Sequence, residues 1–358
     1  MIVSRNTKQK LRKLKKVMEG MRTLLIVMQD NPDPDAIASA MALREIGNRS
    51  FGIRTTLSYG GRIGRAENRE LVHYLGLRLR AFGEVKPANY DLVALVDTQP
   101  GTGNNPLPPD SLVDIVIDHH PMRDGTRQAA FTDVRSQYGA TSTILWEYLC
   151  AADIVPNIPL ATALLYGILS DTQDLGRKSG GSDIEAVEAL YPLANKRMLG
   201  QIQRGRVPTE YYQMLGTALS NARLYGYCAI SALGQVDNPD MIGEVADLLL
   251  RHEDVRWSMC YGFHGGKALI SLRTQDPVRK AEDIVRRIVD GLGTGGGHPT
   301  MAGGQIPLRE DTDAASQQNN PFDFAQGRLD RTIRRRFLKA LKVRGQKAKR
   351  LIHQPFID

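Results

Sequence analysis

The chain has 358 residues, enough for two domains, and 42% of them are hydrophobic, as in an ordinary globular protein. Its apolar runs fall far short of the roughly 20 residues that a membrane span needs, and no signal-peptide pattern follows the basic N-terminus, so we expect a cytoplasmic protein without membrane contact. Three scattered cysteines without CxxC spacing are typical of free thiols in a reducing compartment.

The formal net charge of +8 is distributed unevenly along the chain. Residues 1–22 carry eight Lys/Arg and one Glu, residues 331–358 carry ten Lys/Arg and one Asp, and the part between them has a formal charge of −8. Basic ends of this kind commonly bind RNA or single-stranded DNA by neutralising phosphates. They are equally typical of solvated termini, either helical or frayed, and both interpretations stay open here.

After the basic segment 1–22, the first predicted domain covers residues 23–194. Continuous apolar runs predict buried strands, and apolar residues at helical spacing predict helices. The predicted strands are Thr23–Met28, Thr55–Ser58, Leu92–Asp97 and Val113–Asp118, and the predicted helices are Ala36–Asn48, Glu67–Leu75, Tyr138–Ala151, Pro159–Leu169 and Ser182–Leu193. Alternating strands and helices predict a parallel α/β sheet, in which ligands gather at the carboxyl ends of the strands.

Residues 195–209 are polar and basic without clear periodicity, and we interpret them as a linker. A second, smaller α/β domain is predicted at residues 210–308, ending in a glycine-rich loop at residues 293–304. Its predicted strands are Tyr227–Leu233, Trp257–Phe263 and Ala268–Arg273, and its predicted helices are Met241–His252 and Val278–Leu292. Residues 309–358 are expected to form a polar linker and then a basic tail with helical propensity.

Acidic and histidine residues are concentrated where strands are expected to end. They are NPDPD at residues 31–35, Asp97 closing LVALVD, Asp118-His119-His120 closing VDIVID, and Asp171 after ATALLYGILS. If they meet at one edge of the sheet, such groups suit two divalent metals about 3.5–4 Å apart, an arrangement that hydrolyses phosphate esters. Oxygen and imidazole ligands without a thiolate favour Mn²⁺ over a structural zinc.

With the segments NPDPDAIAS, VDTQP, DHHP, SDT and GGGHPTMAGG, the chain resembles the DHH phosphoesterase superfamily, specifically its DHH–DHHA1 branch. That branch includes bifunctional oligoribonuclease/3′-phosphoadenosine-phosphate phosphatases, di-AMP phosphodiesterases and the RecJ core. The resemblance implies a parallel-sheet DHH domain, a smaller α/β DHHA1 domain and an active site in the cleft between them. It also implies two divalent metals, a short nucleotide or oligonucleotide substrate, and a homodimer as a possible assembly.

The matching motif positions imply how the two metals would be held. Asp97 would bridge them. The other implied ligands are Asp33 and Asp171 for one metal, and Asp35 and His119 for the other. Gln29 stands where family members usually have a ligating histidine, so a weaker ligand, its amide oxygen, is expected there.

Further residues are implied to contact the substrate or to position groups that do. His120 would hydrogen-bond the phosphate or help the leaving group, and Asp118 would orient a histidine. In the second domain the implied contacts are Arg273, His298 and the backbone of Gly296, Gly297 and Gly303, where an anion can approach closely. Arg62 and Arg65 follow the second strand, where they either hold a substrate phosphate or form an ordinary basic surface loop.

The predicted function is metal-dependent hydrolysis of phosphate esters, of the phosphodiesterase or exonuclease type. The expected substrates are short oligonucleotides, linear dinucleotides or 3′-phosphoadenosine 5′-phosphate. Two alternatives stay open: a polyphosphate or pyrophosphate hydrolase, and a non-hydrolytic nucleotide- or RNA-binding protein whose metal site has decayed at Gln29.

Overall fold

The computed structural model describes residues 4–177, 179–276, 278–308, 321–343, 345 and 347–352. The chain divides into two compact units, Met1–Arg206 and Val207–Asp358. This division falls inside the segment predicted as a linker, part of which forms helix α7 (Lys196–Ile202) of the first unit. Residues 309–320 of the predicted polar linker lie outside the described residues.

Six parallel strands form the sheet of the first unit, in the order β3-β2-β1-β4-β5-β6. They are β1 (Thr23–Asp30), β2 (Arg54–Gly60), β3 (Leu79–Ala81), β4 (Leu92–Val96), β5 (Ile115–Asp118) and β6 (Phe131–Val134). The predicted parallel sheet is confirmed. Only the short strands β3 and β6 lacked a sequence signal. The strand order reverses between β1 and β4, and open α/β sheets bind ligands at the carboxyl ends of strands at such a point.

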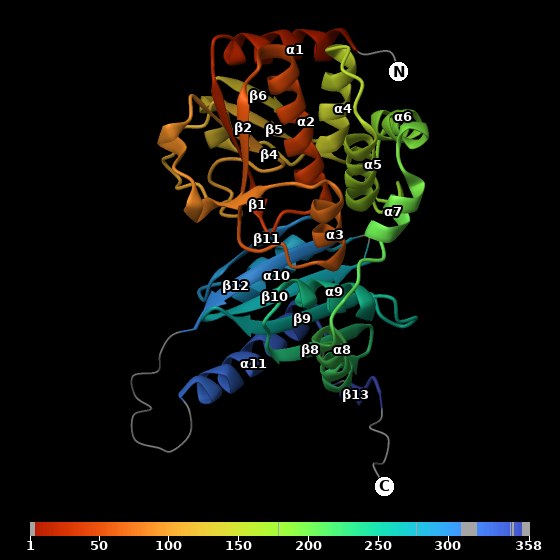
Figure 1. Ribbon diagram of the computed structural model, residues 1–358. Coiled ribbons are helices and arrows are strands. Elements are labelled where there is room, and N and C mark those ends of the chain that lie inside the picture. Colours follow the sequence, from red (N-terminus) through yellow and green to blue (C-terminus); the bar gives the residue numbers. More distant parts are fainter. Residues whose placement is uncertain are drawn as a thin grey trace. The chain divides into compact units, whose positions relative to one another are not determined.

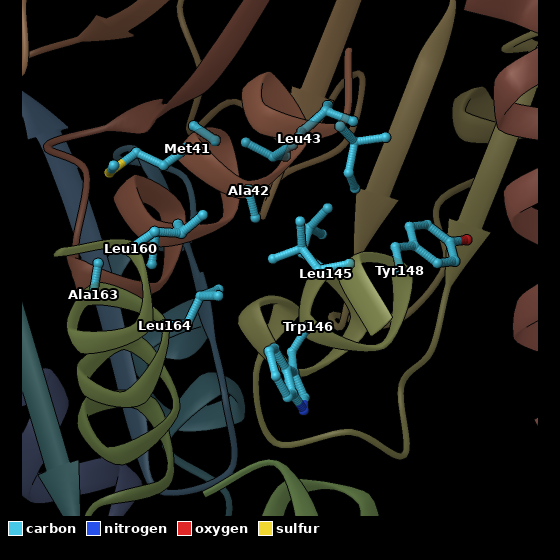
Figure 2. Close-up of a cluster of buried hydrophobic side chains, with 14 of the residues drawn as sticks. Met41, Ala42, Leu43, Leu145, Trp146, Tyr148, Leu160, Ala163 and Leu164 are labelled. Atoms are coloured by element: carbon cyan, nitrogen blue, oxygen red, sulfur yellow. The ribbon is translucent and has the colours of Figure 1, made fainter. Parts of the chain in front are cut away.

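Both faces of this sheet are covered, which explains the continuous apolar sequence of β1. Leu24 and Ile26 pack in the larger core cluster with the helices, whereas Leu25 and Val27 pack in a smaller cluster on the other face. Helices α2 (Pro34–Phe51), α4 (Thr141–Ala151) and α5 (Ile158–Thr172) lie side by side (Figure 1). Figure 2 shows side chains that they bury together: Met41, Ala42, Leu43, Leu145, Trp146, Tyr148, Leu160, Ala163 and Leu164.

The basic N-terminal segment forms part of this core. Helix α1 (Arg5–Met18) buries Leu11, Leu14 and Met18, and most of its basic residues are exposed. Thr7 Oγ1 donates to Glu147 Oε2 of α4. Residues 5–18 of the basic segment therefore form an amphipathic helix of the first unit. The remaining helices of this unit are α3 (Ala66–Tyr74), α6 (Gly181–Leu190) and the short η1 (Phe82–Glu84), η2 (Pro87–Asn89), η3 (Asp124–Gln128) and η4 (Tyr191–Leu193).

The second unit is built on a mixed sheet in the order β11-β12-β10-β9-β8-β7-β13. Its described strands are β7 (Arg223–Tyr225), β8 (Cys228–Gln235), β9 (Trp257–His264), β10 (Lys267–Thr274), β11 (Thr294–Gly297), β12 (Met301–Pro307) and β13 (Lys349–Arg350). Helices α8 (Thr209–Asn221) and α9 (Asp240–Leu249) pack in one core cluster, and α10 (Ala281–Val289) and α11 (Pro321–Ala340) in another. Among the described residues, no helix has the length and apolarity that a membrane crossing needs.

Two expectations for the second unit are corrected. The glycine-rich segment forms an antiparallel hairpin of β11 and β12 and not an irregular loop. The described part of the basic C-terminal segment packs on this unit, because Ile333, Phe337 and Leu341 are at most 1% exposed within its core. Its apolar residues at helical spacing favour burial, while Arg331 and Arg335 are exposed.

Candidate metal centre

The site lies where the strand order reverses, at the ends of β1 and β4. Asn31 and Asp97 directly follow these strands, and both have the left-handed backbone conformation, with φ angles of 57° and 59°. Such strain costs about 1–3 kcal/mol per residue and persists only where the surroundings enforce it. Here the N–H of Asn31 donates to Gly60 O and that of Asp97 to Ile117 O, both at 3.0 Å. Neighbouring strands therefore hold both turns.

Two carboxylates follow Asn31 at the start of α2. Asp33 is the N-cap, and its Oδ1 accepts from the N–H of Ala36 at 3.0 Å. Pro34 occupies the first helical position, where an N–H is not needed. Asp35 lies in the first turn and is 1% exposed. The helix dipole favours negative charge at this end, which partly offsets the cost of burying the two carboxylates.

Asp35 also caps helix α4. Its Oδ2 accepts from the N–H of Thr141 and its Oδ1 from the N–H of Ser142, both at 2.7 Å. Ala140, at the N-cap position of α4, has no polar side chain for this purpose. Gly167 of α5 permits the close packing, because a Cβ there would lie 2.6 Å from Ser142 Oγ and 3.1 Å from Asp35 Cα.

Asp97 lies in the middle of the cluster and is 2% exposed. Its Oδ1 accepts from Thr141 Oγ1 at 2.9 Å. The same oxygen lies 3.5 Å from His119 Nε2 and 3.8 Å from His120 Nδ1. Asp97 is thus in contact with groups that come from the end of β5 and from the start of α4.

Asp118, the last residue of β5, positions His120. Its Oδ1 lies 2.8 Å from His120 Nδ1, and its Oδ2 accepts from Gln99 Nε2 at 2.6 Å. Burial disfavours the charged carboxylate, but the hydrogen bond and charge of His120 lower the pKa of Asp118 to about 2. Gln99 is fully buried, and its Oε1 accepts from Thr126 Oγ1 at 2.7 Å. Gln99 and Asp118 therefore fix the orientation of the His120 ring.

His119 directs an imidazole nitrogen at carboxylates. Its Nδ1 lies 3.3 Å from the carbonyl oxygen of Tyr138, a contact that favours the proton on Nδ1. Nε2 is buried, lies 3.1 Å from Asp171 Oδ2, and has no hydrogen bond of good geometry in the described part of the chain. Asp171 belongs to the last turn of α5. It does not follow a strand as expected, because the apolar run before it forms helix α5, which packs against α2 and α4.

Crowding of carboxylates governs the electrostatics. Burial, followed by the charges of Asp171 and Asp35, raises the pKa of Asp33 to about 6. Burial and the surrounding carboxylates also raise the pKa of Asp35 and, more strongly, that of Asp97. Burial alone would lower the pKa of His119, but Asp171 and Asp35 outweigh it and raise the value to about 9. The cluster therefore favours added positive charge, whether protons or a metal ion.

The residues present fit divalent metals. Among the described residues, two sets have ligand atoms within 4.8 Å of one another: Asp97, Asp118, His119 and His120, and Asp35, His119 and Asp171. Carboxylate and imidazole ligands without a thiolate suit Mn²⁺ and similar cations. The Nε2 of His119 supports this fit most directly, because it is a buried nitrogen that faces carboxylates without a good hydrogen bond.

Asp33 belongs to neither of these two sets of ligand atoms, and it forms a hydrogen bond with Gln29. Gln29 Nε2 donates to Asp33 Oδ2 at 2.9 Å, and Gln29 Oε1 lies 3.4 Å from Asn104 Nδ2. Gln29, expected as a ligand through its oxygen, thus turns its amide nitrogen toward the carboxylates. In this arrangement it orients Asp33 by a hydrogen bond.

The loop after β2 uses its backbone to contact Asn31, the residue that directly follows β1. The N–H of Arg62 donates to Asn31 Oδ1 at 2.8 Å. Only glycine at position 61 allows this close approach, because a Cβ there would lie 2.4 Å from the same oxygen. Arg65 is the N-cap residue of α3, with its guanidinium 3.8 Å from Glu67 Oε1. Phosphate contacts by Arg62 and Arg65 stay a prediction.

In the second unit, Arg273 of β10 is engaged within its own domain. It is 8% exposed, and its Nε donates to Asp247 Oδ1 at 2.6 Å and its Nη1 to Ser271 Oγ at 2.7 Å. Contact with a substrate phosphate would require Arg273 to exchange these partners.

The glycines of the β11–β12 hairpin differ in what the fold requires. At Gly297 and Gly304 a Cβ would lie 2.5 Å and 2.9 Å from atoms of β12 and α10, so no larger residue fits. Gly296 and Gly303 pair across the two strands, and a Cβ at either would have room. This pair therefore presents bare backbone without a packing reason. His298 lies half-buried in the turn between the strands.

Residues beyond the predicted set also build the site. Thr141 and Ser142 begin α4, and the run of Ser and Thr before an apolar stretch is a helix-start signal that could have indicated them. Gly167 interrupts an apolar helix, which indicates a packing constraint. Gln99 lies in the VDTQP segment, but its role depends on contacts that no local pattern reveals.

Comparison with known proteins identifies two family models that match this chain. A family model described as "DHH family, N-terminal domain" matches residues 23–168, and one described as "DHHA1 domain" matches residues 225–320. An uncharacterized protein of Methanocaldococcus jannaschii is 37% identical over 304 residues, which are 84% of this chain and 62% of that protein. The chain thus spans less than two thirds of that relative.

Two solved structures share the fold at 15% identity. An exopolyphosphatase-related protein from Bacteroides fragilis has a TM-score of 0.70 and covers 93% of this chain and 98% of its own. RecJ from Thermus thermophilus, solved in complex with Mn²⁺, has a TM-score of 0.52 and covers 93% of this chain and 55% of its own.

Proposed function

This chain belongs to the DHH–DHHA1 family of phosphoesterases, and we propose that it is a two-metal hydrolase of short oligonucleotides, linear dinucleotides or 3′-phosphoadenosine 5′-phosphate. The observation that carries the proposal is the convergence of Asp35, Asp97 and Asp171 on His119, whose Nε2 is a buried nitrogen without a good hydrogen bond. Buried carboxylates at this density need compensating cations.

Each residue of the first domain has a role in this proposal. Asp35, Asp97, Asp171 and His119 would hold the metals, and Gln29 would position Asp33 beside them. Two divalent metals, when bound, supply Lewis acidity that promotes attack of water on phosphorus and neutralises the phosphate oxygens. His120, held through Nδ1 by Asp118, would hydrogen-bond a phosphate oxygen or give a proton to the leaving oxygen.

The second domain would bind the substrate. Gly296 and Gly303 leave bare backbone on the β11–β12 hairpin, where an anion or a base can approach closely. His298, in the turn of the same hairpin, would add a polar contact. We leave Arg273 out of this contact set, because Asp247 and Ser271 already hold its guanidinium.

A phosphoanhydride substrate, polyphosphate or pyrophosphate, is the second candidate. The structural similarity to an exopolyphosphatase-related protein favours it, and the metal centre would serve that reaction equally well. The third candidate, a non-hydrolytic nucleotide-binding protein, depends on Gln29 having weakened the site.

A substrate panel in Mn²⁺ separates the three. The purified chain is incubated with a labelled dinucleotide, with 3′-phosphoadenosine 5′-phosphate and with polyphosphate, and the products are resolved by chromatography. We expect release of mononucleotide from the dinucleotide, or of phosphate from 3′-phosphoadenosine 5′-phosphate. Phosphate from polyphosphate alone would favour the second candidate, and no turnover of any substrate would favour the third.

A further inference from the structure

The outer side of helix α11 forms a basic groove on the second unit. A hollow of about 460 Å³ is lined by Arg331, Arg334, Arg335, Leu338, Lys339 and Val343. The helical residues of this set recur at intervals of three and four, so they share one side of α11, next to the side that Ile333 and Phe337 bury.

A second hollow of about 260 Å³ adjoins the first at Arg334. Its other lining residues, which include Arg223, Tyr225 and Tyr261, come from β7, β8, β9 and the end of α8. Arg334 is fixed at the junction by Asp330, which also accepts a hydrogen bond from Tyr261 OH. The two hollows, together called the α11 groove below, share the positioned guanidinium of Arg334 in their lining.

The charge of the α11 groove is strongly one-sided. Of the described residues that line it, four are arginines, one is a lysine and none is a carboxylate. The basic residues from Arg331 to Lys339 extend about 12 Å along the helix axis, since each residue adds about 1.5 Å. This length exceeds what one phosphate needs and allows contacts with successive phosphates of one strand.

We propose that the α11 groove binds the phosphate backbone of a single-stranded nucleic acid. Arginine predominates over lysine in it, and the planar guanidinium suits phosphate oxygens. The half-buried Tyr225 beside Arg334 offers an aromatic face to an unstacked base, which a duplex would not present. This site goes beyond the proposed function, because it lies outside the metal centre and its binding requires no metal.

Binding in a chelator tests the groove separately from hydrolysis. Fluorescence anisotropy with a labelled 12-nucleotide RNA or DNA strand in EDTA gives affinity as a function of salt concentration. In Arg331→Ala/Arg335→Ala, the slope of log K against log[salt] should fall in magnitude by about 1.4, which is about 0.7 for each lost phosphate contact. Comparing the RNA and DNA arms shows which strand the groove prefers.

The matched control is Arg251→Ala/Arg256→Ala, which removes two exposed arginines of the same unit from outside the groove. Its slope should equal that of the wild type. Equal slopes for the two double variants, or undiminished binding of the strand by Arg331→Ala/Arg335→Ala, would overturn the proposal, as would tighter binding of polyglutamate or of anionic vesicles than of the strand. Loss of all hydrolysis with binding intact would count only against the proposed function.

Discussion

The metal centre of the first unit and the α11 groove of the second unit hold opposite charges in opposite environments. Asp35 and Asp97 are at most 2% exposed, whereas Arg331 and Arg335 lie at the surface. A buried carboxylate cluster is stable only when protons or metals compensate it, while an exposed basic stripe is stable alone and binds anions by releasing counterions. We therefore expect the metal centre to need bound cations for its stability. The α11 groove is expected to bind an anion reversibly and to be stable without it.

Removing the central carboxylate should have the largest effect. Asp97→Asn keeps the shape of the side chain but removes a charge shared by the whole cluster, so hydrolysis in Mn²⁺ should fall by at least ~10³-fold. Circular dichroism should show an unchanged fold. Near-normal turnover by a well-folded variant would mean that Asp97 does not serve the reaction.

Substitution in the buried face of helix α11 should lower the stability of the second unit without altering the hydrolytic reaction. Phe337 is fully buried where α11 packs on the second sheet, so Phe337→Ala should lower the free energy of unfolding by about 3–5 kcal/mol. Denaturant unfolding measures this loss. The exposed Lys339→Ala on the same helix is the control and should change stability little. Similar small effects for both would show that α11 does not belong to the domain core.

A smaller effect is expected where α5 supports the metal centre. In Gly167→Ala the new methyl group would press on Ser142 and on the backbone of Asp35, which should cost about 1–3 kcal/mol and lower activity through displaced ligands. Gly200→Ala in α7 is the matched control, because a Cβ there meets no atom within 4 Å. If the control loses as much activity as Gly167→Ala, the close packing beneath the site is not what matters.

The smallest expected effect is the change in stability of the metal-free protein with pH. The pKa of Asp33 is raised from 3.8 to about 6, and that of His119 from 6.5 to about 9. Folding therefore favours the protonated form of each, so stability in EDTA should fall as the pH rises, first between about 4 and 6 and then between about 6.5 and 9. Melting temperatures across this range measure the trend.

Two comparisons make the pH test specific. Asp33→Asn should flatten the lower part of the trend and leave the upper part. Saturating Mn²⁺ should stabilise the protein most at high pH, where the ligands are free of protons. A melting temperature that rises steadily with pH in EDTA would contradict the electrostatic description of the site.

Local sequence patterns were sufficient for the parallel sheet and for the turns that carry Asp35, Asp97 and His119. Apolar runs that end in charged residues predict buried strands and their carboxyl ends, and the strand order then brings those ends together. The same reasoning placed Asp171 at a strand end, although the spacing over Pro159–Leu169 correctly predicted a helix, and Asp171 lies in the last turn of that helix.

Contacts between distant segments could not be predicted. Asp35 caps α4 and Gln99 orients Asp118 through hydrogen bonds that depend on the folded arrangement. The packing of the two basic segments was also not evident from their charge. Their charge density suggested free segments, but Leu14 and Phe337 at helical spacing decided the outcome, because burying an apolar stripe is favourable however basic the opposite face is.

Titration calorimetry of the wild-type protein and Asp97→Asn with Mn²⁺ tests the central claim most directly. If buried carboxylates around Asp97 form a two-metal centre, the wild type should bind two ions for each chain. Asp97→Asn should then bind at most one, with weaker affinity, because the shared ligand is gone. Two ions bound by both proteins with equal affinity would contradict the account.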